Sequence, residues 1–166
     1  MLLSERTKMI FVDVDGTIAE EDSKLGCLGS AKTLDELLIL MDPVRIAHLK
    51  PRQKVIDFVT EVSKKELVVI ITGRWEILRD ITIAWLVEHK VPHNALLMRP
   101  YGAWRQSSVS VKEQLFRDYV NKFRNSNGIN ALSWVDDDPD MLAAVRKYAV
   151  HTVNSREEAF ADEVQS

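Results

Sequence analysis

The sequence predicts an α/β fold in which a mostly parallel β-sheet lies between two layers of helices. Short apolar and β-branched runs alternate with longer amphipathic segments along the chain. Three of the short runs are apolar almost throughout, which is typical of parallel strands covered by helices on both faces. This alternation requires right-handed crossover connections, and these produce a three-layer architecture.

Each element can be assigned from its own pattern. The expected strands are residues 9–15, 67–73, 95–100, 132–137 and 148–154. Helical periodicity covers residues 51–65, 75–90, 111–125 and 139–148, and a final helix is expected near 155–165. Strand and helix therefore follow one another from the first strand to the last.

Residues 18–50 interrupt this alternation between the first strand and its crossover helix. They contain a glycine-containing stretch, 24–32, and a short helical candidate, 33–41. We interpret the segment as a small, cap-like insertion over the carboxyl end of the first strand; the alternative is a surface excursion without a role in the site. Because no repeat or linker divides the chain, residues 1–166 are expected to form a single domain.

Composition limits the function classes. The chain has 166 residues, is 46% hydrophobic and 28% charged, and carries a formal charge of -3, which disfavours tight nonspecific duplex binding but allows recognition of a nucleic-acid end. Its single cysteine, Cys27, excludes an internal disulfide, and the four histidines lack paired zinc-ligand spacing. No apolar stretch is long enough to span a bilayer and no signal peptide opens the chain, so a cytoplasmic location without a membrane partner is expected.

Polar residues gather where the expected strands end. They are Asp13 and Asp15 after the first strand, Thr72, Gly73 and Arg74 after the second, Arg99 after the third, and Asp136 to Asp140 after the fourth. Ligands of doubly wound sheets bind at this carboxyl edge, in the crevice where the strand order reverses. Clustered carboxylates repel one another unless a cation lies among them, and oxygen ligands suit Mg²⁺, which keeps open positions for phosphate oxygens. A magnesium ion and a phosphorylated ligand are therefore expected.

The motif residues suit phosphoryl chemistry. Of Asp13 and Asp15, one carboxylate can attack phosphorus and the other can protonate the leaving oxygen; the alternative is a simple Asp-Gly turn. The Thr72 hydroxyl and the amides around Gly73 can bind phosphate oxygens, although a threonine here can also cap a helix. Lys112 can supply the positive charge that such an anionic site needs, or can be a solvated surface lysine.

The acidic run "DDDPD" after the fourth strand has two parts. Asp138, Pro139 and Asp140 suit an N-cap and a first helical turn, whereas Asp136 and Asp137 at a strand tip gain nothing from capping. Asp136 and Asp137 are therefore expected to have a functional rather than a capping role.

Four ordered motifs, "FVDVDGT", "VVIITGR", "SVSVK" and "LSWVDDDPD", resemble the haloacid dehalogenase (HAD) superfamily of aspartyl phosphohydrolases over nearly the whole chain. The resemblance implies a three-layer Rossmann-like sheet of order 3-2-1-4-5. It also implies a role for each motif residue: Asp13 as the nucleophile that forms a phosphoaspartate, Asp15 as the general acid/base, Thr72 as a phosphate ligand, Lys112 as the charge neutraliser, and Asp136 or Asp137 as the metal carboxylate. Asp13 and the backbone carbonyl of Asp15 would complete the Mg²⁺ shell.

The last motif departs from the superfamily pattern, which reads GDxxxD or DDxxxN. Asp136 and Asp140 fit DxxxD, but Asp137 is followed at that spacing by Met141. Which of Asp136, Asp137 and Asp140 contacts the metal is therefore left open.

Within the superfamily, residues 72–92 and 96–112 are similar to the 3'-phosphatase domain of phage-type polynucleotide kinases. In the loop that follows the third strand, Arg99 and Arg105 alternate with aromatic residues close to Lys112, which suits phosphate pairing and base stacking; the alternative packs these aromatics into the core. Gly73, Arg74, Arg99 and Arg105 are thus the expected substrate-binding residues. The chain lacks a GxxxxGK[ST] phosphate loop, so a kinase or ligase partner would be a separate chain or would be absent.

Together these features predict a Mg²⁺-dependent phosphomonoesterase that works through an aspartyl-phosphate on polynucleotide 3'-phosphate ends of DNA or RNA. Two alternatives stay open. One is a phosphatase of free nucleotides or small phosphometabolites, and the other is a noncatalytic phosphate-binding module. The sequence does not set the oligomeric state.

Overall fold

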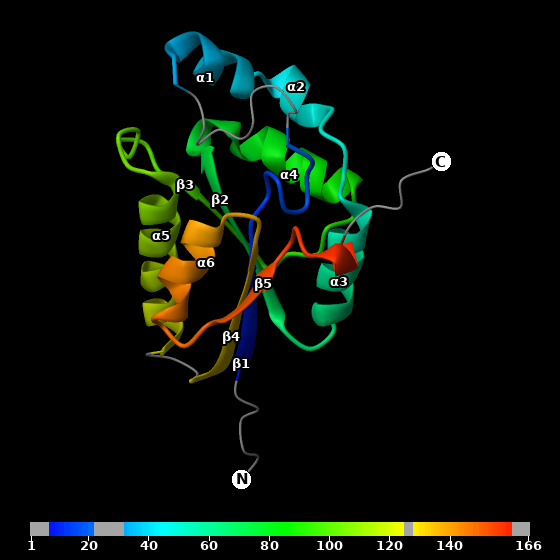
Figure 1. The fold of residues 1–166 in the computed structure, drawn as a ribbon, viewed down its shortest axis with the longest axis vertical. Coiled ribbons are helices and arrows are strands. Elements are labelled where there is room, and N and C mark those ends of the chain that lie inside the picture. Colours follow the sequence, from blue (N-terminus) through cyan, green and yellow to red (C-terminus); the bar gives the residue numbers. More distant parts are fainter. Residues whose placement is uncertain (1–6, 22–31, 125–127, 161–166) are drawn as a thin grey trace.

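The computed structural model describes residues 7–21, 32–124 and 128–160. Its centre is a five-stranded, all-parallel sheet of order β3-β2-β1-β4-β5, as expected (Figure 1). The strands are β1 (Thr7–Val12), β2 (Leu67–Trp75), β3 (Ala95–Arg99), β4 (Ile129–Asp136) and β5 (His151–Asn154). The three-layer, Rossmann-like prediction is confirmed.

Helices cover both faces of the sheet. They are α3 (Gln53–Val62) and α4 (Arg79–Glu88) on one face, and α5 (Ser108–Arg124) and α6 (Pro139–Arg146) on the other (Figure 1). Alternate residues of β1 face the two layers, since Ile10 and Val12 belong to the core cluster that includes α3 and α4 residues, whereas Met9 and Phe11 belong to the cluster with α5 and α6.

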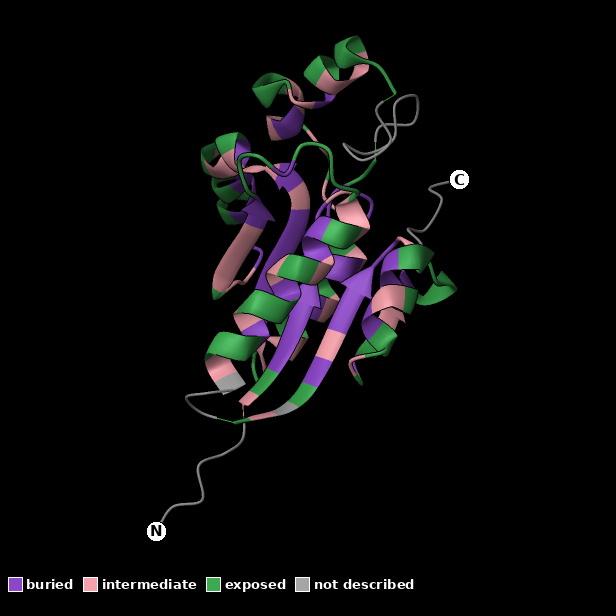
Figure 2. Ribbon diagram, turned by 90° about the vertical axis from the view of Figure 1, so that its left-hand side faces the viewer, coloured by how far each residue is buried: buried purple, intermediate pink, exposed green. Residues whose placement is uncertain are grey.

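Burial explains why the central strands are apolar almost throughout. In Figure 2 the strands are mostly buried, while the outer surfaces of the helices are exposed. Strand β1 is hydrogen-bonded on both sides, to β2 and to β4, so it has no free edge. Its carboxyl end, where the chain leaves the sheet, is therefore held in place by two neighbours.

Two expected boundaries differ from the structure. The segment expected as a helix from residue 75 begins with a short 3-10 helix, Glu76–Leu78, because β2 continues to Trp75 through an irregularity in its pairing with β3. The final helix expected near 155–165 is a single 3-10 turn, Glu158–Phe160, within the described residues. Residues 161–165 lie outside them.

The segment between β1 and α3 contains one more helix than expected. The predicted helix is α1 (Leu34–Leu40), and a second short helix, α2 (Pro43–Ala47), follows it. The Asp42 side chain caps α2 by accepting a hydrogen bond from the Val44 amide, so the Asp-Pro pair is a helix start signal, although no helix was expected there. Both helices lie beyond the carboxyl ends of β2 and β3 (Figure 1). Of the stretch 24–32, only Lys32 is described.

None of the helices in the described part of the chain combines the length and the hydropathy that a membrane span requires.

Candidate active site

A cavity of about 700 Å³ opens at the carboxyl edge of the sheet. Among its lining residues are Asp13 and Asp15, which follow β1, Asp136 and Asp137 at the end of β4, and Lys112 from α5. The chain runs outward from β1 to β2 and β3 and later returns to place β4 on the other side of β1. The cavity thus lies at the point where the strand order reverses, which is where doubly wound sheets bind ligands.

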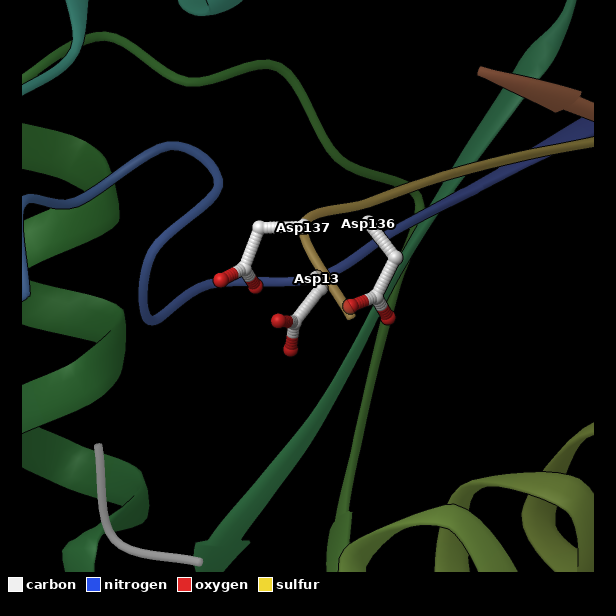
Figure 3. A group of neighbouring side chains, drawn as sticks. All are labelled: Asp13, Asp136 and Asp137. Atoms are coloured by element: carbon white, nitrogen blue, oxygen red, sulfur yellow. The ribbon is translucent and has the colours of Figure 1, made fainter. Parts of the chain in front are cut away.

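Three carboxylates converge in this cavity. Asp13, Asp136 and Asp137 each offer one oxygen, and these oxygens lie within 4.8 Å of one another (Figure 3). Such an oxygen-only set suits a hard divalent cation such as Mg²⁺. The structure therefore brings together the acids from two motifs that are more than a hundred residues apart.

Lys112 lies between two of these carboxylates. Its Nζ is 2.9 Å from Asp13 Oδ1 and 2.9 Å from Asp136 Oδ2. Burial disfavours the charged ammonium, but the two carboxylates outweigh burial and raise the pKa of Lys112. The side chain is buried, so the alternative of a solvated lysine is excluded.

The site is nevertheless short of positive charge. Burial and the neighbouring Asp136 raise the pKa of Asp13 well above its usual value, despite the opposing effect of Lys112. An added cation would relieve this crowding of carboxylates.

Asp15 lines the same cavity but is not part of the three-carboxylate cluster. Arg74 holds it with two hydrogen bonds, from Nε to Oδ2 at 2.9 Å and from Nη2 to Oδ1 at 2.8 Å. Arg74 is fully buried and also donates to Thr82 Oγ1 in α4. It does not line the cavity, so it orients Asp15 from behind.

The turn after β1 packs directly against Asp137. Gly16 has a φ of +80°, and a Cβ added there would lie 2.5 Å from Asp137 Oδ2. Only glycine allows this close approach in this conformation. The Thr17 hydroxyl donates to Asp13 Oδ2 at 3.4 Å and lies 3.5 Å from Asp137 Oδ1. The Asp-Gly pair is therefore a turn, and that turn positions the carboxylates.

Thr72 and Gly73 lie inside the extended end of β2, not at a helix start. Thr72 is fully buried, does not line the cavity, and its Oγ1 accepts a hydrogen bond from the Arg74 amide. Gly73 does line the cavity, and a Cβ there would meet Ser108 Oγ at 2.4 Å. Gly73 is therefore not at a helix N-terminus, although it lies beside the cavity.

The loop after β3 is held together by Arg99. This buried side chain donates to the carbonyls of Gly73, Ala103 and Gln106, with its Nε 3.0 Å from the Gly73 oxygen. Arg105 instead lies over the Trp104 ring, with its Cζ 4.3 Å from the ring centroid. Trp104 is 57% exposed, so the alternative that packs the loop aromatics into the core is excluded.

Asp138 and Asp140 play the capping role that their spacing suggested. The Asp138 side chain accepts a hydrogen bond from the Asp140 amide at 2.9 Å and so caps α6. The Asp140 side chain is exposed and lies outside the three-carboxylate cluster. The Asp138 amide in turn donates to Asp136 Oδ1, which fixes that carboxylate.

Two arginines that the sequence motifs did not reveal support the site. Arg156 lines the cavity, with its Nη2 2.5 Å from Asp137 Oδ2 and 3.0 Å from Glu21 Oε2. Arg52 donates from Nη1 to the Gly16 carbonyl and from Nη2 to the Ser155 carbonyl, both at 2.7 Å. Neither residue belongs to a motif, so no local signal identified them.

Ser107 and Ser108 also line the cavity and were not among the expected site residues. Ser107 directly precedes the "SVSVK" motif, and Ser108 is the first residue of that motif and of α5. The signal that could have found them is this motif, since Ser108 belongs to it and Ser107 adjoins it.

Comparison with known proteins assigns the chain to a family. Residues 7–160 match the family described as "Polynucleotide kinase PNKP phosphatase domain". No curated protein matches the chain.

Solved structures share the fold. In the structure titled "Structure of Pnkp1/Rnl/Hen1 complex", one chain is 17% identical with a TM-score of 0.65; the alignment covers 91% of this chain and 46% of that chain. The HAD-like hydrolase SP0104 from Streptococcus pneumoniae is 12% identical with a TM-score of 0.56, over 89% of this chain and 84% of that one. The HAD domain of effector protein Lem4 from Legionella pneumophila is 18% identical with a TM-score of 0.50, over 92% and 90%. This chain thus spans less than half the length of the Pnkp1-complex chain that it matches.

Proposed function

Because the chain belongs to the family of polynucleotide kinase PNKP phosphatase domains and is therefore a HAD-type phosphatase, we propose that it is a Mg²⁺-dependent phosphomonoesterase acting through an aspartyl-phosphate on polynucleotide 3'-phosphate ends. The observation that carries this proposal is the convergence of Asp13, Asp136 and Asp137 in one cavity, with the Lys112 ammonium between the first two. We further infer that residues 1–166 form one phosphatase domain with 18–50 as a small insertion.

The carboxylate cluster fits a magnesium ion. Asp13, Asp136 and Asp137 would hold it, and the oxygen-only donor set is the evidence for the fit. When bound, Mg²⁺ would polarise the phosphoryl oxygens and offset their charge. Lys112 supplies a fixed positive charge beside the nucleophile whether or not the metal is present.

In the first step, a carboxylate oxygen of Asp13 attacks phosphorus and the phosphorus–oxygen bond to the leaving group breaks. The leaving oxygen takes a proton from the Asp15 carboxyl group. Both Asp15 oxygens accept hydrogen bonds from Arg74, so donating this proton requires Asp15 to release at least one of them. The product is a phosphoaspartate at Asp13 and a free 3'-hydroxyl.

In the second step, Asp15 takes a proton from water and the resulting hydroxide attacks phosphorus. The bond to Asp13 breaks, inorganic phosphate leaves, and Asp13 and Asp15 return to their starting states. Uncatalysed phosphate-monoester hydrolysis is so slow that acceleration can reach ~10²¹, whereas acid–base catalysis alone supplies about 10²–10⁴. The nucleophile, the acid, the lysine and the metal must therefore act together.

The polynucleotide substrate is supported by the family match and by the arginine and tryptophan pair, Arg105 and Trp104, at the exposed loop beside the cavity. The similar chain in the Pnkp1/Rnl/Hen1 complex supports a kinase or ligase chain as a partner. A cytoplasmic location stays a prediction to be tested.

A panel of phosphomonoesters tests this function. We expect phosphate release to be fastest from a 3'-phosphorylated oligonucleotide, slower from the 5'-phosphorylated isomer, a 3'-mononucleotide and a sugar phosphate, and lost in EDTA. Asp13→Asn should abolish release, whereas Asp118→Asn, at an exposed carboxylate on α5, should not.

A preference for mononucleotides or the sugar phosphate would reject the polynucleotide substrate. Turnover by Asp13→Asn at the wild-type rate would remove Asp13 as the nucleophile. Hydrolysis of none of the esters would favour the noncatalytic alternative.

A further inference from the structure

Next to the reaction centre, we propose that a second cavity, lined by Trp75 and Trp104, binds the nucleobase adjoining the phosphate that is removed. This inference uses one part of the proposed function, namely that the phosphate to be removed lies beside Asp13. It assigns to the protein a base-binding subsite, and it makes the terminal base, as well as the phosphate, part of what the enzyme recognises.

The second cavity is contiguous with the first. It measures about 270 Å³ and shares Ser107 and Ser108 with the catalytic cavity. The remaining lining residues come from α1 and the residues before it, from the end of β2, and from the loop that follows β3: Lys32, Thr33, Leu34, Leu37, Trp75, Arg99, Trp104 and Gln106. Whole drug-sized ligands occupy roughly 300–1,000 Å³, so this space suits one ring system and not a second complete nucleotide.

Two tryptophans give the cavity its chemistry. Trp104 is 57% exposed and carries the Arg105 guanidinium over its ring. Trp75 has the Arg99 guanidinium 5.7 Å from its ring centroid. Aromatic faces backed by arginine are a recurring means of stacking bases, and stacking tolerates any base because each has a π-face.

The cavity also offers hydrogen-bonding groups. Gln106 lines it, and among the described residues its side chain has no hydrogen-bond partner. The Lys32 side chain lines it as well and forms no ion pair with any residue in the described ranges. An amide that can donate and accept suits a base edge, and an ammonium suits the next backbone phosphate.

Charge favours this side of the reaction centre over the opposite one. A third cavity, of about 310 Å³, adjoins the catalytic cavity through Glu21 and Arg156 and is lined by a second acid, Glu20. Its arginines are already engaged, since Arg52 binds backbone carbonyls and Arg156 binds Asp137. The tryptophan cavity has no acidic residue among its described lining. A polyanionic chain is therefore attracted toward the tryptophans and repelled from the two glutamates.

The test compares two 3'-phosphorylated oligonucleotides that differ only in whether the terminal nucleotide carries a base or is abasic. Affinity is measured by fluorescence anisotropy of a 5'-labelled strand in an Asp13→Asn background, so that the result does not depend on turnover. Trp104→Ala should weaken binding of the base-bearing strand between about fivefold and one hundredfold, and should leave the abasic strand within about twofold. Trp104→Phe, which keeps a ring, should restore most of the loss.

Tyr101→Ala is the matched control, because Tyr101 is an exposed aromatic on the same loop that lines neither cavity. It should change neither affinity. Equal loss on both strands with Trp104→Ala, or loss on neither, overturns the base-binding subsite. A third outcome separates the two proposals. If Trp104→Ala weakens binding of the base-bearing strand alone, but the protein with Asp13 intact does not hydrolyse that strand, the proposed function fails while the subsite stands.

Discussion

At the scale of single residues, each of four carboxylates in the site is bound by a basic side chain. Lys112 bridges Asp13 and Asp136, Arg74 grips Asp15, and Arg156 binds Asp137. Because Arg156 occupies Oδ2 of Asp137 and the Thr17 hydroxyl lies near Oδ1, the orientation of that carboxylate is fixed from two sides.

Removing Arg156 tests the worth of that orientation. Arg156→Ala should weaken Mg²⁺ binding about 10–100-fold, because partners that orient metal ligands have effects of that size. Calorimetric titration of Mg²⁺ measures it, and Arg146→Ala, at a guanidinium on α6 that binds only Thr152 among the described residues, serves as the control. Tighter Mg²⁺ binding by the Arg156 variant would instead show that the arginine competes with the cation.

The motif acids could be predicted because each lies at the end of an apolar run. Such a run predicts a strand, and so places the acid at the carboxyl edge of the sheet. Arg52 and Arg156 could not, since each acts on a segment far away in the chain and neither sits in a recognisable pattern. The sequence also left open which of Asp136, Asp137 and Asp140 contacts the metal. In the structure, Asp136 and Asp137 lie with Asp13, whereas Asp140 is exposed at a helix start. The difference is one of side-chain direction, which the sequence pattern does not specify.

At the scale of elements, the contact that shapes the site is between the turn after β1 and the tip of β4. Gly16 makes this contact possible, and a Cβ would approach three atoms of the Asp137 carboxylate at 2.5 to 2.9 Å. A Cβ at Gly16 would therefore fit only if the Asp137 side chain moved away.

Comparing the single variants Gly16→Ala and Gly128→Ala separates the effect of this crowding from the effect of backbone strain. Both glycines have positive φ, but a Cβ at Gly128 meets no atom of the described residues within 4 Å. Each variant should lose about 1–2 kcal/mol in denaturant unfolding. Only Gly16→Ala should also lose kcat, by about a hundredfold, since a misplacement of about 1 Å in an active site can have that cost. Equal kcat in the two variants would show that Asp137 does not depend on the turn.

Elements were predictable where hydrophobic periodicity was strong, and less so where chain geometry overrides it. The continuation of β2 to Trp75 follows from its irregular pairing with β3, which no local pattern encodes. Helix α2 is only five residues long and is stabilised by the packing of Ile46 with Leu78 and Met98, so its apolar content was too small to show a period.

At the scale of the whole molecule, the strand order decides which motifs meet. Periodicity predicted the strands but not their order, which came from the resemblance to a known superfamily. The order places β1 between β2 and β4, and so brings the first and last acidic motifs to one edge. The lysine between them offsets only part of their charge.

Magnesium should therefore stabilise the entire fold. At a concentration of 100 Kd, a ligand that binds only the folded state adds about 2.7 kcal/mol, which corresponds to a rise in Tm of roughly 5–10 °C for a chain of this size. Thermal unfolding with and without Mg²⁺ measures the shift, and Asp137→Asn should abolish most of it. An identical rise in Tm in Asp137→Asn would show that the ion binds elsewhere in the molecule.

The clamp formed by Arg52 has a consequence for biogenesis. Arg52 ties the turn at Gly16 to Ser155, which lies 139 residues further along the chain. A nascent chain can pair β1 with β2 long before it can complete this fastening. The full set of these Arg52 contacts can therefore form only after synthesis has passed Ser155.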